Sequence, residues 1–372
     1  MRKSPKTLLI TGKSNIIYLS NFTGSNGFML LIGNKHYLFT DFRYIERAKN
    51  TIGKNITIID STKMWRDPET LAENWHRILK KHKIKSIGIE EDHLTISQLK
   101  KFQKISKIKG QKITFKNSSE KIEKLREIKS KKEIELITKS QKLNEKIFML
   151  IKKFIQSSLG KKACLACPAA RWTADTAKIT ELDLVWKIKE FAHDLGADGI
   201  SFEPIIAFGK HSSIPHHLPD KTILKKGDII LIDMGMKYHG YRSDMTRMIF
   251  TKPPTGEEKE IYNLVLNAQE YAIKNIRAEM TGHKADSFAR NIIKKAGYGE
   301  AFGHGGGHGI GLDIHESPSL SENYKSKLKK NTIITVEPGI YIEGKFGVRI
   351  EDMVLVTKTG TKNLTKIKKS LF

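Results

Sequence analysis

Cysteine is scarce in this sequence. The two cysteines of the 372-residue chain, Cys164 and Cys167, cannot build a disulfide framework, which favours a reducing compartment. Long apolar runs are also missing. The run Leu8-Leu9-Ile10 near the start falls short of the roughly 7–15 apolar residues of a secretory signal, and none approaches the roughly 20 that cross a bilayer. We therefore expect a cytoplasmic protein without a membrane partner.

Acidic residues are outnumbered by basic ones, 40 to 66, which gives a formal net charge of +26. Such a charge can indicate nucleic-acid binding. The lysines are scattered along the whole chain, however, and no RNA- or DNA-binding motif accompanies them. We expect no specific nucleic-acid partner, although weak, salt-sensitive association with polyanions would fit the charge.

The chain is longer than one hydrophobic core usually supports, so two domains are expected. Residues 1–121 alternate strand-like and helix-like segments, which predicts a smaller α/β domain. Strands are expected at 16–19, 56–59 and 84–89, a hairpin at 28–40 across Gly33-Asn34, and a helix at 70–82. Residues 122–372 are expected to form the second domain.

The second domain is predicted to begin with a long helix. Ser130 and Glu133 have the spacing of a capping box, and an apolar stripe with a helical period follows. Further helices are expected at 181–195 and 257–276. Strands are expected at 228–236, 241–250, 332–336 and 347–356, the first two pairing across Tyr238-His239-Gly240. Helices beside an antiparallel sheet predict an α+β fold.

Four acidic residues stand in or beside apolar strands, where a buried carboxylate needs a partner. They are Asp233 in IILIDMG, Asp244 in YRSDMTRMIF, Glu337 in IITVEPGIYI and Glu351 in VRIEDMVLV. A single such acid could be a structural hydrogen-bond partner. Several carboxylates together, with His308 from GHGGGHGIGLDIHE, indicate cations, because like charges stay ionised side by side only around positive charge. Carboxylate and imidazole ligands suit Mn²⁺, Fe²⁺, Co²⁺ or Zn²⁺.

The segments LIDMG, GYRSDMTR, GHGIGLDIHE, TVEPGIY and GVRIED, in this order, resemble the pita-bread metallopeptidases, the family of methionine aminopeptidase, aminopeptidase P and prolidase. The resemblance implies a pita-bread catalytic domain with two divalent metal ions, Mn²⁺ being expected first. It also implies that Asp233 chelates one metal, that Asp244 and Glu351 bridge both, and that His308 and Glu337 bind the other.

The same resemblance assigns roles around the metals. Glu337 would also accept the proton of the attacking water. His216 in SSIPHHLP is similar to the histidine beside the substrate amide, although His217 is adjacent to it. His315 in HESP is similar to the histidine that steadies the carbonyl oxygen as it gains charge. His304 and Arg349 would support the metal ligands.

The N-terminal segments YLSNFTGSNG and LFTDFRY resemble the small creatinase-like domain of the proline-specific members, which helps to close the active site, often across a dimer. Asp41, Arg43 and Tyr44 fit this function and a locally hydrogen-bonded turn equally well. We therefore expect a homodimer that removes the N-terminal residue from peptides with proline in second position. The alternatives are an Xaa-Pro dipeptidase (prolidase) and a non-catalytic binding protein with the same fold.

One stretch departs from the family pattern. Residues 161–178 are inserted before the helix expected at 181, and they carry the Cys164-x-x-Cys167 pair. A zinc site needs about four ligands, and the chain offers no second pair of cysteines. We interpret the insert as a variable surface loop.

Overall fold

The computed structural model describes residues 6–62, 68–107, 110, 112–159 and 178–369. The chain forms two compact units, Met1–Arg126 and Glu127–Phe372. The insert with Cys164 and Cys167 lies outside the described residues, except for Lys178. Within the described ranges, no helix combines the length and the apolar character needed to cross a membrane.

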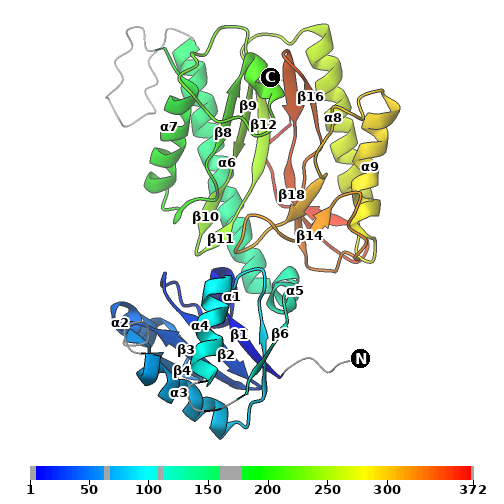
Figure 1. The fold of residues 1–372 in the computed structure, drawn as a ribbon. Coiled ribbons are helices and arrows are strands. Elements are labelled where there is room, and N and C mark those ends of the chain that lie inside the picture. The colour runs from blue at the N-terminus through cyan, green and yellow to red at the C-terminus, as the bar shows by residue number, and fades with distance from the viewer. Residues whose placement is uncertain (1–5, 63–67, 108–109, 111, 160–177, 370–372) are drawn as a thin grey trace. The chain divides into compact units, whose positions relative to one another are not determined.

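The first unit is built on one mixed sheet with the strand order β4-β3-β2-β1-β5-β6 (Figure 1). Strands β1, β2 and β3 pair antiparallel, whereas β4, β5 and β6 pair in parallel with their neighbours. The predicted hairpin is confirmed as β2 and β3, joined at Gly33, whose φ is 53°. The six strands are Thr7–Ile10, Phe28–Ile32, Lys35–Thr40, Ile56–Asp60, Ser86–Ile89 and Thr114–Asn117.

Helices cover both faces of this sheet, so the predicted α/β architecture is confirmed. One face packs against Trp75 of α3 and Phe102 of α4. The other packs against Ile16 of α1 and Ala48 of α2. The strand predicted at 16–19 is wrong, because these residues lie in α1; a short apolar run does not distinguish the two states. The helices are α1 Lys13–Ser20, α2 Phe42–Thr51, α3 Pro68–Lys81, α4 Ile96–Lys107 and α5 Lys121–Glu127.

In the second unit, antiparallel strands lie between two pairs of helices (Figure 1). Helices α6 and α7 pack on one apolar core, and α8 and α9 on another. The predicted α+β class is therefore confirmed, but helix α9 was not predicted. These helices are α6 Lys131–Leu159, α7 Glu181–Asp194, α8 Gly256–Asn275 and α9 Gly282–Lys295.

The strands form small sheets in the orders β11-β10-β7, β12-β9-β8, β14-β13-β15-β18-β19 and β16-β17. Three strands expected to be continuous are interrupted. The strand expected at 228–236 divides at Gly235 into β9 and β10. The return strand splits into β11 and β12, and the last long strand into β17 and β18. The strands are β7 Gly199–Ile200, β8 Ile205–Phe208, β9 Ile229–Met234, β10 Met236–Tyr238, β11 Tyr241–Arg242, β12 Met245–Phe250, β13 Gly307–Gly309, β14 Glu316–Leu320, β15 Ile333–Val336, β16 Gly339–Ile342, β17 Phe346–Arg349, β18 Asp352–Val356 and β19 Thr361–Asn363.

Helix α6 begins with the predicted capping box. The backbone N–H of Ser130 donates to Glu133 Oε2 at 2.9 Å, and the Glu133 N–H donates back to Ser130 Oγ at 3.4 Å. Its buried face is not purely apolar. Ser140 Oγ donates to the carbonyl oxygen of Met236 at 2.7 Å, and Asn144 Nδ2 donates to that of Met234 at 2.8 Å. The helix thus satisfies the carbonyls where β9 ends and β10 begins.

Candidate metal centre

The five predicted ligands come from five different stretches of the second unit. Asp233 lies in β9, paired in register with Thr246 of β12. Asp244 stands in the break between β11 and β12, and Glu351 in the break between β17 and β18. His308 is the middle residue of β13, and Glu337 directly follows β15. The two strand breaks therefore coincide with two of the four acidic positions.

The break beside Asp244 depends on close backbone packing. A Cβ atom at Gly235 would lie 2.0 Å from the carbonyl oxygen of Ser243, so glycine is required there. Polar side chains satisfy the backbone groups that leave the ladder: Ser243 Oγ accepts from the Met236 N–H at 3.0 Å, and Ser201 Oγ donates to the Met236 carbonyl at 2.6 Å. Specific side-chain hydrogen bonds therefore stabilise the backbone at this strand break.

The structure brings the predicted ligands together. His308 Nε2 lies 3.6 Å from Asp244 Oδ2 and 3.4 Å from Glu337 Oε1. Asp244, His308 and Glu351 each offer a ligand atom, and these atoms all lie within 4.8 Å of one another. The charge of Asp233 raises the pKa of Asp244, Glu337 and Glu351. Asp233, the fifth predicted ligand, therefore interacts electrostatically with the same group of residues.

The carboxylates of the centre repel one another in a place that water barely reaches. Burial raises the pKa of Asp244 well above its ordinary value, and the charges of Glu351, Asp233 and Glu337 raise it further. Burial also raises the pKa of Glu351, with Glu337 and Asp233 adding to the effect. The pKa of His308 is lowered by burial, which favours the neutral imidazole that can ligate a metal. A nearby divalent cation would relieve this repulsion.

Three carboxylate oxygens of the centre are buried without a hydrogen-bond partner among the described residues. They are Asp233 Oδ1, Asp244 Oδ1 and Glu351 Oε1. In two cases the other oxygen is held: Asp233 Oδ2 accepts from Arg349 at 2.7 Å, and Glu351 Oε2 from Thr246 Oγ1 at 2.8 Å. Unpartnered buried oxygens are costly unless a cation binds them. The residues present therefore fit divalent metal ions.

Arg349 organises one side of the centre. Besides Asp233, its guanidinium donates to Thr246 Oγ1 at 3.1 Å, to the Tyr341 hydroxyl at 2.8 Å and to the Pro215 carbonyl at 3.3 Å. His304 Nε2 lies 2.9 Å from the same Tyr341 hydroxyl. Sequence analysis singled out Arg349 and His304 but missed Tyr341 and Thr246, although both lie inside the motifs TVEPGIY and SDMTR.

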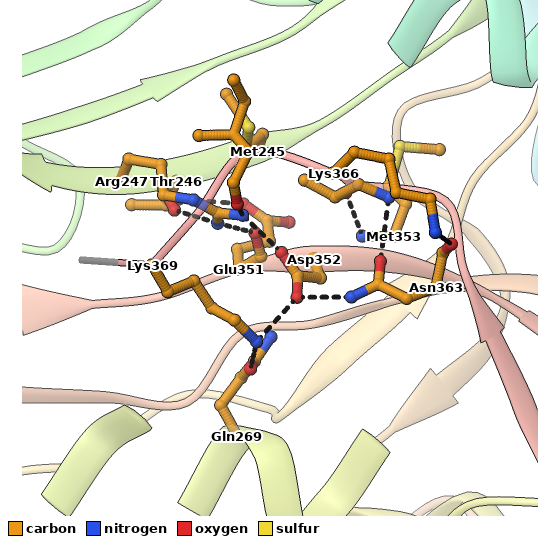
Figure 2. Close-up of polar contacts among 12 residues, drawn as sticks. Met245, Thr246, Arg247, Gln269, Glu351, Asp352, Met353, Asn363, Lys366 and Lys369 are labelled. Atoms are coloured by element: carbon orange, nitrogen blue, oxygen red, sulfur yellow. Dashed lines mark hydrogen bonds and ion pairs between the residues drawn. The ribbon is translucent and has the colours of Figure 1, made fainter. Parts of the chain in front are cut away.

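A buried ion pair between Arg247 and Asp352 holds the backbone at Glu351 (Figure 2). Arg247 Nη1 donates to the backbone carbonyl of Glu351 at 2.6 Å, and its Nη2 lies 2.6 Å from Asp352 Oδ1. Asn363 and Lys369 donate to the other oxygen of Asp352 at 2.8 and 3.1 Å. The C-terminal segment is thereby tied to the strand break that presents Glu351. Sequence analysis missed this pair, because its partners are about a hundred positions apart.

The two histidines expected to meet the substrate are both exposed. The ring of His315 lies 4.3 Å from that of His308, centroid to centroid, at 87°. Burial and then the neighbouring His308 lower the pKa of His315, and the charge of His216 contributes to the same shift. His216 follows Pro215, whose carbonyl accepts from Arg349. Both rings therefore lie beside the metal centre and within reach of a ligand.

Lys129 forms a further buried contact next to this region. Its ammonium Nζ lies 2.6 Å from Glu316 Oε1, with 1% and 7% of the two side chains exposed. Glu316 directly follows His315. Sequence analysis did not identify this pair, because a lysine in a basic chain gives no sign of being buried.

The residues around Asp41 in the first unit form local hydrogen bonds, as expected for the locally hydrogen-bonded turn that was one of their two interpretations. Asp41 caps α2 by accepting from the Arg43 N–H at 3.1 Å, and Arg43 Nη2 lies 2.8 Å from Asp41 Oδ2. Asn26 Nδ2 donates to the same carboxylate, and the Tyr44 hydroxyl contacts Ser25 Oγ.

Comparison with known proteins defines the class. Residues 135–358 match the metallopeptidase family M24, and residues 2–128 match the creatinase/prolidase N-terminal domain. The chain belongs to metallopeptidase family M24. The predicted pita-bread catalytic domain with a creatinase-like N-terminal domain is thus confirmed.

Similar proteins cover nearly the whole chain. The Xaa-Pro dipeptidase of Pyrococcus horikoshii is 34% identical over 371 residues, 100% of this chain and 95% of that protein. The structure of the Xaa-Pro dipeptidase from Bacillus anthracis has a TM-score of 0.87 and 33% identity, covering 99% of this chain and 94% of that one. The X-Pro aminopeptidase from Thermotoga maritima has a TM-score of 0.83 and 31% identity, covering 99% and 97%.

Proposed function

We propose that this chain is a metal-dependent peptidase that hydrolyses the Xaa–Pro bond and releases the N-terminal residue from peptides with proline in second position. The observation that carries the proposal is the group of Asp233, Asp244, His308, Glu337 and Glu351. Three of its members, Asp233, Asp244 and Glu351, each have a buried carboxylate oxygen that lacks a hydrogen-bond partner among the described residues. Relatives named Xaa-Pro dipeptidase and X-Pro aminopeptidase support the choice of bond.

The five residues would hold two divalent metal ions, with Asp244 and Glu351 shared between them. Mn²⁺ is the ion we expect first, because carboxylate ligands with one imidazole suit it; Co²⁺, Zn²⁺ and Fe²⁺ are the alternatives. When bound, such a metal pair supplies Lewis acidity and a water molecule of lowered pKa. Asp233 would contribute its unpartnered Oδ1, since Arg349 occupies Oδ2.

The chain's own groups would then position the peptide and move the proton. Glu337 is 17% exposed, so its carboxylate can face the substrate, and Thr335 Oγ1 donates to its Oε1 at 3.2 Å. We assign Glu337 the transfer of a proton towards the proline nitrogen. His315 would donate a hydrogen bond to the carbonyl oxygen as it gains charge, and His216 would bind the substrate amide.

Prolidase activity is the second candidate, because the Pyrococcus and Bacillus relatives are named dipeptidases. The two activities differ in whether a residue after proline is tolerated. The third reading is a binding protein without catalysis. Such relatives usually lose metal ligands, whereas all five predicted positions are filled here.

The test compares Ala-Pro with Ala-Pro-Ala, using enzyme stripped of metal and assayed with and without added Mn²⁺. Metal-dependent release of alanine from the tripeptide would establish the aminopeptidase. Cleavage of the dipeptide alone would establish the prolidase instead. Absence of cleavage of both, with Co²⁺, Zn²⁺ and Fe²⁺ also tried, would favour the binding protein.

We further propose that the active protein is a homodimer, as the resemblance to the family implies, and that it is cytoplasmic, as the short apolar runs and the two cysteines suggest. Light scattering coupled to size exclusion measures the mass of the assembly directly, and a monomeric mass would refute the homodimer. Fractionation of the source cells tests the cytoplasmic location. No nucleic-acid partner is expected, so binding to RNA should weaken steeply as salt rises and show no sequence preference.

A further inference from the structure

A second cluster of metal-ligating side chains lies outside the five-residue group. Glu181 opens helix α7, His211 lies in the short 3₁₀ helix Gly209–Ser213, and His217 follows a few positions later. Glu181 Oε1 lies 2.9 Å from His211 Nδ1, and Oε2 lies 2.7 Å from His217 Nε2. The carboxylate is fully buried, and His217 is 8% exposed. Ligand atoms of all three lie within 4.8 Å of one another.

The backbone fixes the orientation of the Glu181 carboxylate. Oε1 accepts from the Phe208 N–H at 2.8 Å, and Oε2 accepts from the Asp220 N–H at 3.0 Å. A carboxylate has about four lone-pair positions, so one on each oxygen remains, and these two face the imidazoles. Hydrogen bonds of this kind orient carboxylates that ligate metals. The imidazoles of His211 and His217 now occupy these two positions, and a cation would bind there in place of the N–H protons.

We propose that Glu181, His211 and His217 bind a third metal ion, of the zinc type, separate from the peptidase centre. Two imidazole nitrogens and one carboxylate form a ligand set that zinc accepts, with a water molecule in the remaining position. Atoms bound to one tetrahedral zinc ion are roughly 3.3 Å apart. The three ligand atoms lie within 4.8 Å of one another, so the side chains would have to shift to bind one ion. The ion would displace one proton from each histidine nitrogen that now faces the carboxylate.

The charge around the cluster favours a cation. Hydrogen bonds from Thr222 lower the pKa of Asp220, and the charges of His211 and His217 lower it as well. The backbone N–H of Asp220 donates to Glu181, which places this residue next to the cluster. With neutral histidines, Glu181 and Asp220 supply two negative charges to balance a divalent ion.

The ion would stabilise the loop that carries His216, a consequence that rests on the function proposed above for this histidine. The ion would link α7 to both flanks of that loop, since His211 precedes and His217 follows His216. The loop is already tied at Pro215 to Arg349 and at Ser212, whose Oγ accepts from the Gly347 N–H at 2.9 Å. Zinc would add a link between this loop and α7.

The experiment counts zinc in the full-length chain. Protein stripped with a chelator is reloaded with excess Zn²⁺, desalted and assayed for zinc per chain. The decisive variant is His211→Asn with His217→Gln. The asparagine amide nitrogen stands as many bonds from Cα as Nδ1, and the glutamine nitrogen as many as Nε2. Both can therefore keep donating to Glu181 while removing the metal ligands. His193→Gln, at a histidine that is 91% exposed, controls for adventitious surface binding.

The proposal predicts that the double variant holds one zinc ion fewer than the wild type, whereas His193→Gln holds the same number. After Co²⁺ loading, the double variant should also lose part of the visible absorption. Equal zinc contents in the wild type and the double variant would overturn the proposal and leave a hydrogen-bonded cluster. Asp244→Ala separates the two sites: it should lose zinc from the peptidase centre and keep the ion that the histidines bind, whether or not peptides are cleaved.

Discussion

Arg349 binds Asp233 through one oxygen only. Its Nη2 lies 2.7 Å from Asp233 Oδ2, with 4% and 12% of the two side chains exposed. Oδ1 of the same carboxylate has no hydrogen-bond partner among the described residues. The guanidinium is further held by Thr246 and Tyr341, so its position is fixed from several directions. Arg349 therefore determines which oxygen of Asp233 can face a metal.

Replacing Arg349 should weaken the centre without removing a ligand. Arg349→Met is expected to lower metal affinity or activity by roughly 10–100-fold, as loss of a group that orients a ligand typically does. Arg349→Lys should recover little, because an ammonium cannot reproduce the planar fork of donors. Metal titration followed by the Xaa-Pro assay measures both. Full activity in the lysine variant would mean that charge alone is required.

Removing a shared ligand should have a larger effect. Asp244→Ala and Glu351→Ala are each expected to abolish hydrolysis and to lower the metal content of the purified protein, because both metals would lose a ligand. Asp194→Ala, at a position 61% exposed on α7, is the matched control and should behave as the wild type. Near-normal turnover in either centre variant would contradict the dinuclear proposal.

His315 should affect catalysis but not metal binding. We expect His315→Ala to lower kcat by about 10²–10³-fold, the usual cost of losing a donor to a developing oxyanion. Its metal content should match that of the wild type. Steady-state kinetics and elemental analysis on one preparation decide the matter; lost metal would show that His315 is itself a ligand.

The buried pair of Lys129 and Glu316 should matter far more than an exposed pair. Lys129→Met leaves a carboxylate with 7% exposure without its cation, which is expected to cost about 3–5 kcal/mol of unfolding free energy. Lys327→Met breaks a pair whose side chains are 64% and 75% exposed, and should cost about 0–1 kcal/mol. Urea unfolding of both variants makes the comparison. Equal losses would contradict the burial argument.

The helix cap at Asp41 predicts a pH effect in the first unit. Its hydrogen bonds with Arg43 lower the pKa of Asp41 to about 2, against the opposing effect of burial, from an ordinary value of 3.8. A depressed pKa stabilises the fold above the ordinary value, and that stability is lost as pH falls towards about 2. Asp41→Asn should therefore be less stable than the wild type at pH 6, with the difference shrinking below pH 4. A difference independent of pH would refute this cause.

Local patterns were sufficient for much of the fold. The capping residues Ser130 and Glu133 predicted the start of α6, and the glycine turn at Gly33 predicted the hairpin of β2 and β3, because each signal acts within a few residues. Helix α9 was missed, and its buried residues are mostly small: Gly282, Ala285 and Ala289 are buried beside Ile293. The breaks beside Asp244 and Glu351 were also missed, since they depend on contacts with distant strands and not on local propensity.

In the site, the acidic residues of the strands could be predicted from the sequence, because carboxylates are rare in apolar surroundings. The residues that support these acids could not be predicted in this way. Thr246, Asp352 and Lys129 are ordinary residue types in their local sequence, and only tertiary contacts give them a function. The domain boundary near residue 121 stays a prediction, and limited proteolysis that cuts near this position would support it.

The polar face of α6 supports the strand that carries Asp233. Asn144 lies 90 positions before Met234, whose carbonyl it holds, and Met234 is next to Asp233. In a library of random substitutions, Asn144→Leu would look harmless by helix propensity and by hydrophobicity. It would nevertheless remove the donor to the Met234 carbonyl, next to the proposed metal ligand Asp233. Positions that score as neutral on sequence grounds can therefore be intolerant, and α6 is where such positions should be sought first.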